Sequence, residues 1–183
     1  MRRRIVVVGF TCACLCVLGG LFAWRRTRVA APKPSVRPVA SADIASHPAL
    51  VFAEKQYRRR GGKYIWGAND CSAFVSDYLS RQSKTLKSRV TTWELAQIGV
   101  EKYGLVIAGD TKTGDVLNYR YKSQRREGMA GHCGVVLKKP DGFWVVHNCA
   151  SMGLVIQRLG EFYATAKAYG VGRADVIILR PQA

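Results

Sequence analysis

A run of 20 uncharged residues near the start constrains this chain more than any other feature. It extends from Ile5 to Trp24, and three arginines stand on each side of it. A helix of that length is about 30 Å long, which matches the hydrocarbon core of a bilayer. The pattern predicts a membrane anchor over residues 1–24, with a transmembrane helix over 5–24. A signal peptide that is removed after export is the alternative.

The segment that follows has the composition of a linker. Residues 29–41 contain three prolines and few large apolar side chains, which is typical of an extended spacer. The 183-residue chain has room for one further domain of ordinary size. We therefore expect an anchor over 1–24, a proline-containing linker over 25–47 and a folded domain over 48–183.

The charge of the chain limits its partners. The formal net charge is +17, and after residue 41 the chain still has 21 basic against 12 acidic residues. Such a balance favours anionic partners such as acidic wall polymers, lipid head groups or nucleic acid. No zinc-finger, helix-turn-helix or RNA-binding motif accompanies the basic residues, so we expect no nucleic-acid partner.

The order of hydrophobic patterns after residue 47 indicates the fold class. Helical spacing comes first, and Thr91 with Glu94 forms a capping box that opens the third helix. Short runs rich in β-forming residues follow, with a hairpin turn at residues 140–142. The expected helices cover 50–59, 71–82 and 91–103, and the expected strands cover 115–121, 131–137, 143–149, 154–159 and 174–179. Helices followed by an antiparallel sheet describe an α+β domain.

Cys71 stands where a loop-like segment changes into an amphipathic helix. Unpaired N–H groups and the helix dipole stabilise a thiolate at such a position, which lowers the pKa of the thiol. The alternative is that Cys71 is a small buried apolar residue.

His132 and His147 lie on the two strands of the predicted hairpin. Because side chains alternate along strands, the two imidazoles come opposite one another or one diagonal step apart, roughly 5–8 Å across the ladder. A thiol at a helix start with two neighbouring imidazoles fits a thiol hydrolase. By residue type, Cys71, His132, His147 and Cys149 also form a possible zinc set, although structural zinc sites usually contain closer cysteine pairs. Cys133 alternates away from His132, and we expect it to pack on the other face.

Five short motifs occur in a fixed order between residues 64 and 147. They are Tyr64-Ile65-Trp66-Gly67, Asp70-Cys71-Ser72, Gly114-Asp115-Val116, His132-Cys133-Gly134 and Val146-His147. In this order they resemble the NlpC/P60 family of bacterial cell-wall cysteine peptidases. The chain departs from the family pattern in a short loop between Gly67 and Asp70, in Ala73 where glycine is usual, and in a longer hairpin between the histidines.

The resemblance implies a papain-like α+β fold and a role for each matching residue. Cys71 would be the nucleophile, His132 the general base and acid, and His147 the residue that orients His132. Tyr64 would stabilise the oxyanion together with the Cys71 N–H. Asp70 and Ser72 would contact the free amino end of a stem peptide. Trp66 would form a wall of the cleft.

The resulting expectation is a membrane-anchored cysteine peptidase that hydrolyses an amide bond in peptidoglycan stem peptides and needs no metal or cofactor. It would sit in the bacterial inner membrane as a single-pass protein, with its catalytic domain on the periplasmic or extracellular side. Two alternatives remain open. One is a thiol amidase or acyltransferase on the same fold, and the other is a non-catalytic basic module that binds the cell wall.

Overall fold

The computed structural model describes residues 35–82, 88–122 and 131–182. The transmembrane helix expected over residues 5–24 lies outside these ranges. Of the helices within them, none combines the length and the apolar character needed to cross a bilayer.

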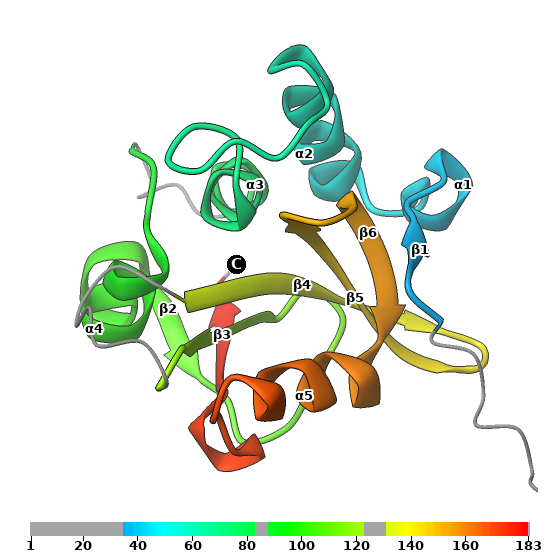
Figure 1. The fold of residues 1–183 in the computed structure, drawn as a ribbon. Coiled ribbons are helices and arrows are strands. Elements are labelled where there is room, and N and C mark those ends of the chain that lie inside the picture. The colour runs from blue at the N-terminus through cyan, green and yellow to red at the C-terminus, as the bar shows by residue number, and fades with distance from the viewer. Residues whose placement is uncertain (1–34, 83–87, 123–130, 183) are drawn as a thin grey trace, which may run out of the picture. The chain divides into compact units, whose positions relative to one another are not determined.

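An antiparallel sheet of seven strands forms the centre of the described domain (Figure 1). The strands are β1 (Arg37–Pro38), β2 (Leu105–Ile107), β3 (Val116–Arg120), β4 (Gly131–Lys139), β5 (Gly142–Cys149), β6 (Gly153–Arg158) and β7 (Ile177–Pro181). Their order in the sheet is β1-β6-β5-β4-β3-β7-β2, and every neighbouring pair is antiparallel. The long strands β4 and β5 therefore lie in the interior of the sheet.

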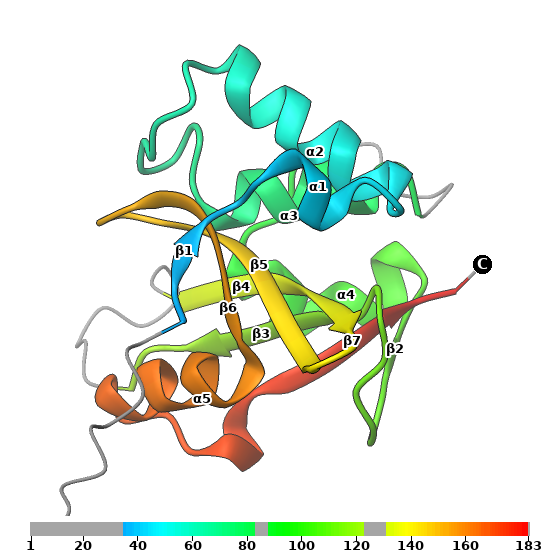
Figure 2. The same ribbon diagram turned by 90° about the vertical axis from the view of Figure 1, so that its right-hand side faces the viewer.

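Helices cover both faces of this sheet. They are α1 (Ser41–Ile44), α2 (Pro48–Arg59), α3 (Cys71–Leu79), α4 (Thr92–Tyr103) and α5 (Leu159–Ala168), with a short 3-10 helix at Arg173–Asp175. Helix α3 packs on β4 and β5 with α2 beside it, and α5 packs on the opposite face over β5 and β6 (Figures 1 and 2). Helix α4 packs against β2, β3 and β4. The α+β class with an antiparallel sheet, predicted from the sequence, is confirmed.

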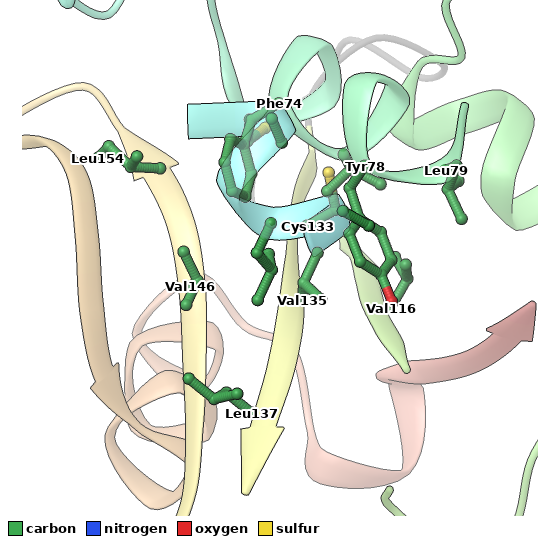
Figure 3. Close-up of a cluster of buried hydrophobic side chains, with 14 of the residues drawn as sticks. Phe74, Tyr78, Leu79, Val116, Cys133, Val135, Leu137, Val146 and Leu154 are labelled. Carbon is green, nitrogen blue, oxygen red and sulfur yellow. The ribbon is translucent and has the colours of Figure 1, made fainter. Parts of the chain in front are cut away.

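Alternation along the central strands divides the core into two clusters. Toward α3, the strands direct Val116, Cys133, Val135, Leu137 and Val146, which meet Phe74, Tyr78 and Leu79 of that helix (Figure 3). Toward α5, they direct Leu117, Tyr119, Val136 and Val145, which pack with Phe162 and Ala166. The predicted packing of Cys133 on the face away from His132 is confirmed, since its side chain is fully buried in the first cluster.

Side-chain caps fix where the two helices nearest the nucleophile begin. Asp70 is the N-cap of α3 and accepts a hydrogen bond from the Ala73 N–H at 3.0 Å. At α4, Thr91 accepts from the Glu94 N–H, while the Glu94 carboxylate accepts from the Thr91 N–H at 2.7 Å. This reciprocal pair is the predicted capping box.

The hairpin of β4 and β5 turns at residues 140–141, inside the turn predicted at 140–142, and Gly142 already belongs to β5. Val135 pairs with Val146 and Val136 with Val145. Continuing this register places Gly134 opposite His147, so that His132 lies one diagonal step from His147.

The expected boundary between linker and domain at residues 47 and 48 is wrong. Residues 35–47 were assigned to the linker, yet β1 pairs with the edge of β6, and Val39 and Ile44 are buried in the core. Asp43 forms an ion pair with Arg37 inside the segment and another with Lys139 of β4, which holds the segment to the central sheet. The segment has too few apolar residues to show a periodic pattern, and it is ordered by the open edge of β6.

Helix α5 and strand β2 do not follow from the sequence pattern. Leu159 was expected to end a strand, but it begins α5, whose buried side chains are only Phe162 and Ala166. The last strand begins at Ile177 instead of Ala174, because Arg173–Asp175 form the 3-10 helix. The apolar stripe of α5 is so narrow that it gives little helical periodicity in the sequence.

Candidate active site

The nucleophile candidate is held by a short and tightly bonded loop. Cys71 is the first residue of α3 and is 5% exposed. In the preceding loop, the buried side chain of Asn69 donates to the Lys63 carbonyl at 2.8 Å, and Gly67 adopts a left-handed conformation with φ 75°. From β5, the Asn148 amide donates to the Asn69 carbonyl at 2.7 Å. These bonds tie the start of α3 to the strand that carries His147.

The two histidines contact one another directly, as the register predicted. His132 Nε2 and His147 Nδ1 are 2.8 Å apart, and the rings are nearly perpendicular. Gly134 makes this arrangement possible: a Cβ at that position would lie 2.6 Å from Val145 Cγ1 and 2.9 Å from His147 Cβ. The glycine of the His-x-Gly motif therefore provides the space that His147 occupies.

Aromatic side chains enclose the pair of imidazoles. Phe162 of α5 stacks on the His132 ring with centroids 5.7 Å apart and meets the His147 ring edge-on at 5.5 Å. Tyr119 of β3 packs edge-on against His132 at 5.9 Å. Because these walls are apolar, charge interactions between the site residues are stronger than they would be in water.

The surroundings of Cys71 lower the pKa of its thiol well below the usual value. A hydrogen bond with the Cys133 side chain is the largest influence, and burial opposes it; the charge of His132 and a hydrogen bond from His132 lower the pKa further. Burial raises the pKa of Cys133 well above the usual value, and the neighbouring Cys71 raises it further. Cys133 therefore remains protonated beside the ionised Cys71.

His147 is held in its neutral form. Burial lowers the pKa of His147 well below its usual value, the charge of His132 lowers it further, and the side chain of Gln157 opposes both effects. A neutral His147 carries one ring proton, so only one of its two nitrogens can accept a hydrogen bond.

Tyr64 and Trp66 flank the nucleophile. Burial and the charges of Cys71 and Asp70 raise the pKa of Tyr64, so its hydroxyl stays protonated at neutral pH and remains a hydrogen-bond donor. Trp66 is 60% exposed and forms part of the wall of a cavity beside Cys71.

Asp70 and Ser72 are engaged with a cation of this chain. Arg89 Nη2 lies 2.7 Å from each oxygen of Asp70 and 3.0 Å from Ser72 Oγ, and Ser72 donates to Asp70 at 2.7 Å. Asp70 also accepts from the N–H groups of Gly67 and Ala73. Because Arg89 already balances the charge of Asp70, a substrate ammonium group would have to compete with a guanidinium for the same oxygens.

A cavity of about 250 Å³ opens beside the nucleophile. The start of α3 supplies Cys71 and Ser72, the start of α4 supplies Thr92, and Arg89 and Trp66 line the remaining walls. This volume is enough for one amino-acid side chain with part of its backbone, so the cavity is the candidate substrate site.

The Gly-Asp motif lies apart from this chemistry. Gly114 has φ 91° and accepts a hydrogen bond from the Tyr78 hydroxyl through its carbonyl. The buried Asp115 pairs with Arg180 of β7, with 2.8 Å between Arg180 Nε and Asp115 Oδ1. This motif connects β3 to β7 and supports the sheet.

A metal site is not assembled in the described part of the chain. Among residues 35–82, 88–122 and 131–182, no three His, Cys, Asp or Glu side chains are arranged to hold an ion. Cys149, the fourth member of the possible zinc set, lies 3.8 Å from the Ser151 hydroxyl.

Three residues of the site are not revealed by local sequence patterns. Arg89 is 19 positions from its partner Asp70, and no local pattern connects them. The hydrogen bond of Cys133 to Cys71 depends on how α3 docks on β4. Gln157 gave a weak signal, since it is a polar residue among the apolar residues of a strand that is buried on both faces.

Comparison with known proteins identifies the family of this chain. The model of the NlpC/P60 family matches residues 60–173, which include all the candidate site residues. No curated protein and no solved structure matches the chain. Members of the matched family are generally cysteine peptidases or amidases that act on peptidoglycan. The family match covers more than half of the chain, and the chain belongs to the NlpC/P60 family.

Proposed function

We propose that this protein is a membrane-anchored cysteine peptidase that hydrolyses an amide bond in peptidoglycan stem peptides. In this proposal Cys71 is the nucleophile, His132 is the general base and acid, and His147 orients His132. Family membership supports the reaction class, and the site geometry supports the assignment of roles.

The reaction begins with attack by sulfur. Because the pKa of Cys71 is lowered, the thiolate is present at neutral pH and attacks the carbonyl carbon of a peptide bound in the cavity. His132 holds a proton and gives it to the leaving amine as the tetrahedral intermediate collapses. Water, deprotonated by His132, then releases the acyl group from Cys71.

The oxyanion of the tetrahedral intermediate needs hydrogen-bond donors. The Cys71 N–H lies in the first turn of α3, where backbone N–H groups have no partner within the helix. The Tyr64 hydroxyl, which stays protonated, is the second donor in this proposal.

Arg89 changes the expected substrate contacts. Asp70 and Ser72 form a neutral unit with Arg89, so we propose that they shape the cavity and that a free amino end is not required for binding. Trp66 supplies an exposed aromatic wall at the entrance.

The proposed location follows from the sequence of residues 1–24. The uncharged run over 5–24 would anchor the protein in the bacterial inner membrane and leave the domain on the periplasmic or extracellular side, where its substrate lies. The basic composition of the domain is compatible with an anionic wall polymer.

The single observation that carries the proposal is the 2.8 Å contact between His132 and His147 beside the thiol of Cys71, whose pKa is lowered by the Cys133 side chain and by His132. A residue with only a packing role would not need this arrangement of proton carriers.

The test is digestion of purified peptidoglycan with the full-length protein and with its Cys71→Ala variant. Mass spectrometry of the soluble products identifies the new termini. We expect new amino and carboxyl termini within the stem peptide for the wild type and none for Cys71→Ala. Cleavage at the bond between glycan and peptide would favour an amidase. Binding without new termini would favour a wall-binding module and would refute the peptidase.

A further inference from the structure

The pair formed by His132 and His147 ends at a buried ring nitrogen that has no hydrogen-bond partner in the part of the chain that the structure describes. His147 Nδ1 faces His132, while His147 Nε2 is inaccessible to solvent and has no hydrogen-bond partner among the described residues. The amide nitrogen of Gln157 is likewise buried and has no hydrogen-bond partner within the described ranges. Buried polar atoms without partners are uncommon in folded proteins and call for an explanation.

Strand register brings these two side chains together. Gln157 of β6 pairs with Val145 of β5, and His147 pairs with Val155. Gln157 and His147 are therefore diagonal neighbours on the same face of the sheet, and both are at least 96% buried. Gln157 acts on the ring as a hydrogen-bond acceptor does, because its side chain raises the pKa of His147 against the effect of burial.

The proton on His147 decides whether His132 can act as a base once it has given its own proton to the leaving amine and is neutral. If Nε2 of His147 carries the proton, His147 Nδ1 accepts from His132 Nε2–H, and His132 Nδ1 is free to accept a proton from water. If Nδ1 of His147 carries the proton instead, it donates to His132 Nε2. The remaining proton of His132 then sits on its Nδ1, and His132 cannot accept a proton there.

We propose that Gln157 is a positioning residue whose Oε1 accepts the Nε2–H of His147 and so selects the productive tautomer of both imidazoles. The chain of hydrogen bonds then runs from His132 Nε2–H to His147 Nδ1, and from His147 Nε2–H to Gln157 Oε1. Its catalytic consequence rests on the proposed function, but the tautomer itself does not.

A glutamine side chain can present either its amide oxygen or its amide nitrogen to the ring, and the proposal requires the oxygen. The amide nitrogen in that place would donate to His147 Nε2 and favour the unproductive tautomer. The rings are otherwise enclosed by aromatic side chains: Tyr119 of β3 faces His132, and Phe162 of α5 faces both rings. The Cys71 thiolate is the charged group that interacts with His132.

Long-range ¹H–¹⁵N NMR of the histidine rings in the full-length protein tests the tautomer without any substrate. The chain has three histidines, His47, His132 and His147, so His47→Gln and His147→Asn variants assign the signals. We expect His147 to be protonated on Nε2 in the wild type and in Gln157→Glu, and to lose this preference in Gln157→Leu. A proton on Nδ1 of wild-type His147, or the same spectrum in Gln157→Leu, would overturn the proposal.

The kinetics of hydrolysis of the stem-peptide bond that the enzyme cleaves give a second readout. We expect Gln157→Leu to lower kcat about 10-fold or more with little change in KM, because a buried N–H loses its acceptor. The alkaline limb of kcat/KM should move to lower pH in Gln157→Leu and to higher pH in Gln157→Glu, since a carboxylate stabilises the imidazolium of His132 through His147. Ile156→Leu, on the opposite face of β6, is the matched control and should change neither quantity.

The two experiments separate the possible failures. If the wild type cleaves no peptidoglycan but His147 carries its proton on Nε2, the proposed function fails and the positioning role of Gln157 stands. If cleavage occurs and both Gln157 variants shift the pH profile in the same direction, or not at all, the positioning role is refuted while the peptidase stands.

Discussion

Removing the Cys133 thiol should make Cys71 far less reactive in mildly acidic solution. The hydrogen bond with the Cys133 side chain is the largest influence that lowers the pKa of Cys71. Cys133 is fully buried, so a truncated side chain at that position leaves no donor on that side of Cys71. A hydrogen bond to a charged group contributes about 1.5–3 kcal/mol. At about 1.4 kcal/mol for each factor of ten, Cys133→Ala should reduce the thiolate fraction of Cys71 about 10- to 150-fold.

The sign of the effect fixes the pH range of the assay. Cys133→Ala raises the pKa of Cys71, so the variant reacts more slowly where the thiol is mostly protonated. The alkylation rates of the two proteins converge at alkaline pH, where Cys71 is ionised in both. The rate of alkylation of Cys71 by iodoacetamide, followed by mass spectrometry of its peptide between about pH 4 and pH 9, measures this difference.

Two controls make the result specific. Cys133→Ser keeps a donor at the same position and should retain most of the reactivity of the wild type. Cys149→Ala removes a partly exposed thiol at the end of β5 and should change nothing. Equal alkylation rates for Cys133→Ala and the wild type across the acidic range would refute the role of Cys133.

Three further predictions concern the histidines and the motif glycine and aspartate. His132→Ala should lower kcat about 10²–10⁴-fold, and His147→Ala by a smaller factor, because His147 only orients its neighbour; equal losses in a kinetic assay would contradict this division. Gly134→Ala should destabilise the fold by about 1–3 kcal/mol in denaturant titration and displace His147, whereas Gly109→Ala, with no atom near its added Cβ, should be neutral. Asp115→Asn should lower the thermal midpoint but leave kcat of the folded protein unchanged; a fall in kcat alone would place Asp115 in catalysis.

Local patterns in the sequence were sufficient for much of the fold. The start of α3 follows from the change from loop to amphipathic helix at Cys71, and the start of α4 follows from the Thr91–Glu94 capping box. The contact between His132 and His147 follows from alternation along two strands joined by a short turn. Each of these features depends on residues that are close in sequence or joined by one hairpin.

Other features depend on contacts that no local pattern encodes. Strand β1 exists because the edge of β6 is open to it, and α5 is helical because the sheet covers its narrow apolar stripe. Arg89 meets Asp70 through the packing of the chain around α3 and α4, although the two residues are far apart in the sequence. Gln157 meets His147 through the register of β5 and β6, which depends on the whole sheet.

Trapping of the acyl-enzyme tests the central claim most directly. The full-length protein is mixed with peptidoglycan fragments and quenched in acid within milliseconds to seconds, and its peptides are then mapped by mass spectrometry. The account predicts a stem-peptide fragment joined to Cys71 through a thioester, absent from Cys71→Ala. Release of the same fragments by Cys71→Ala, with no adduct on Cys71 of the wild type, would contradict it.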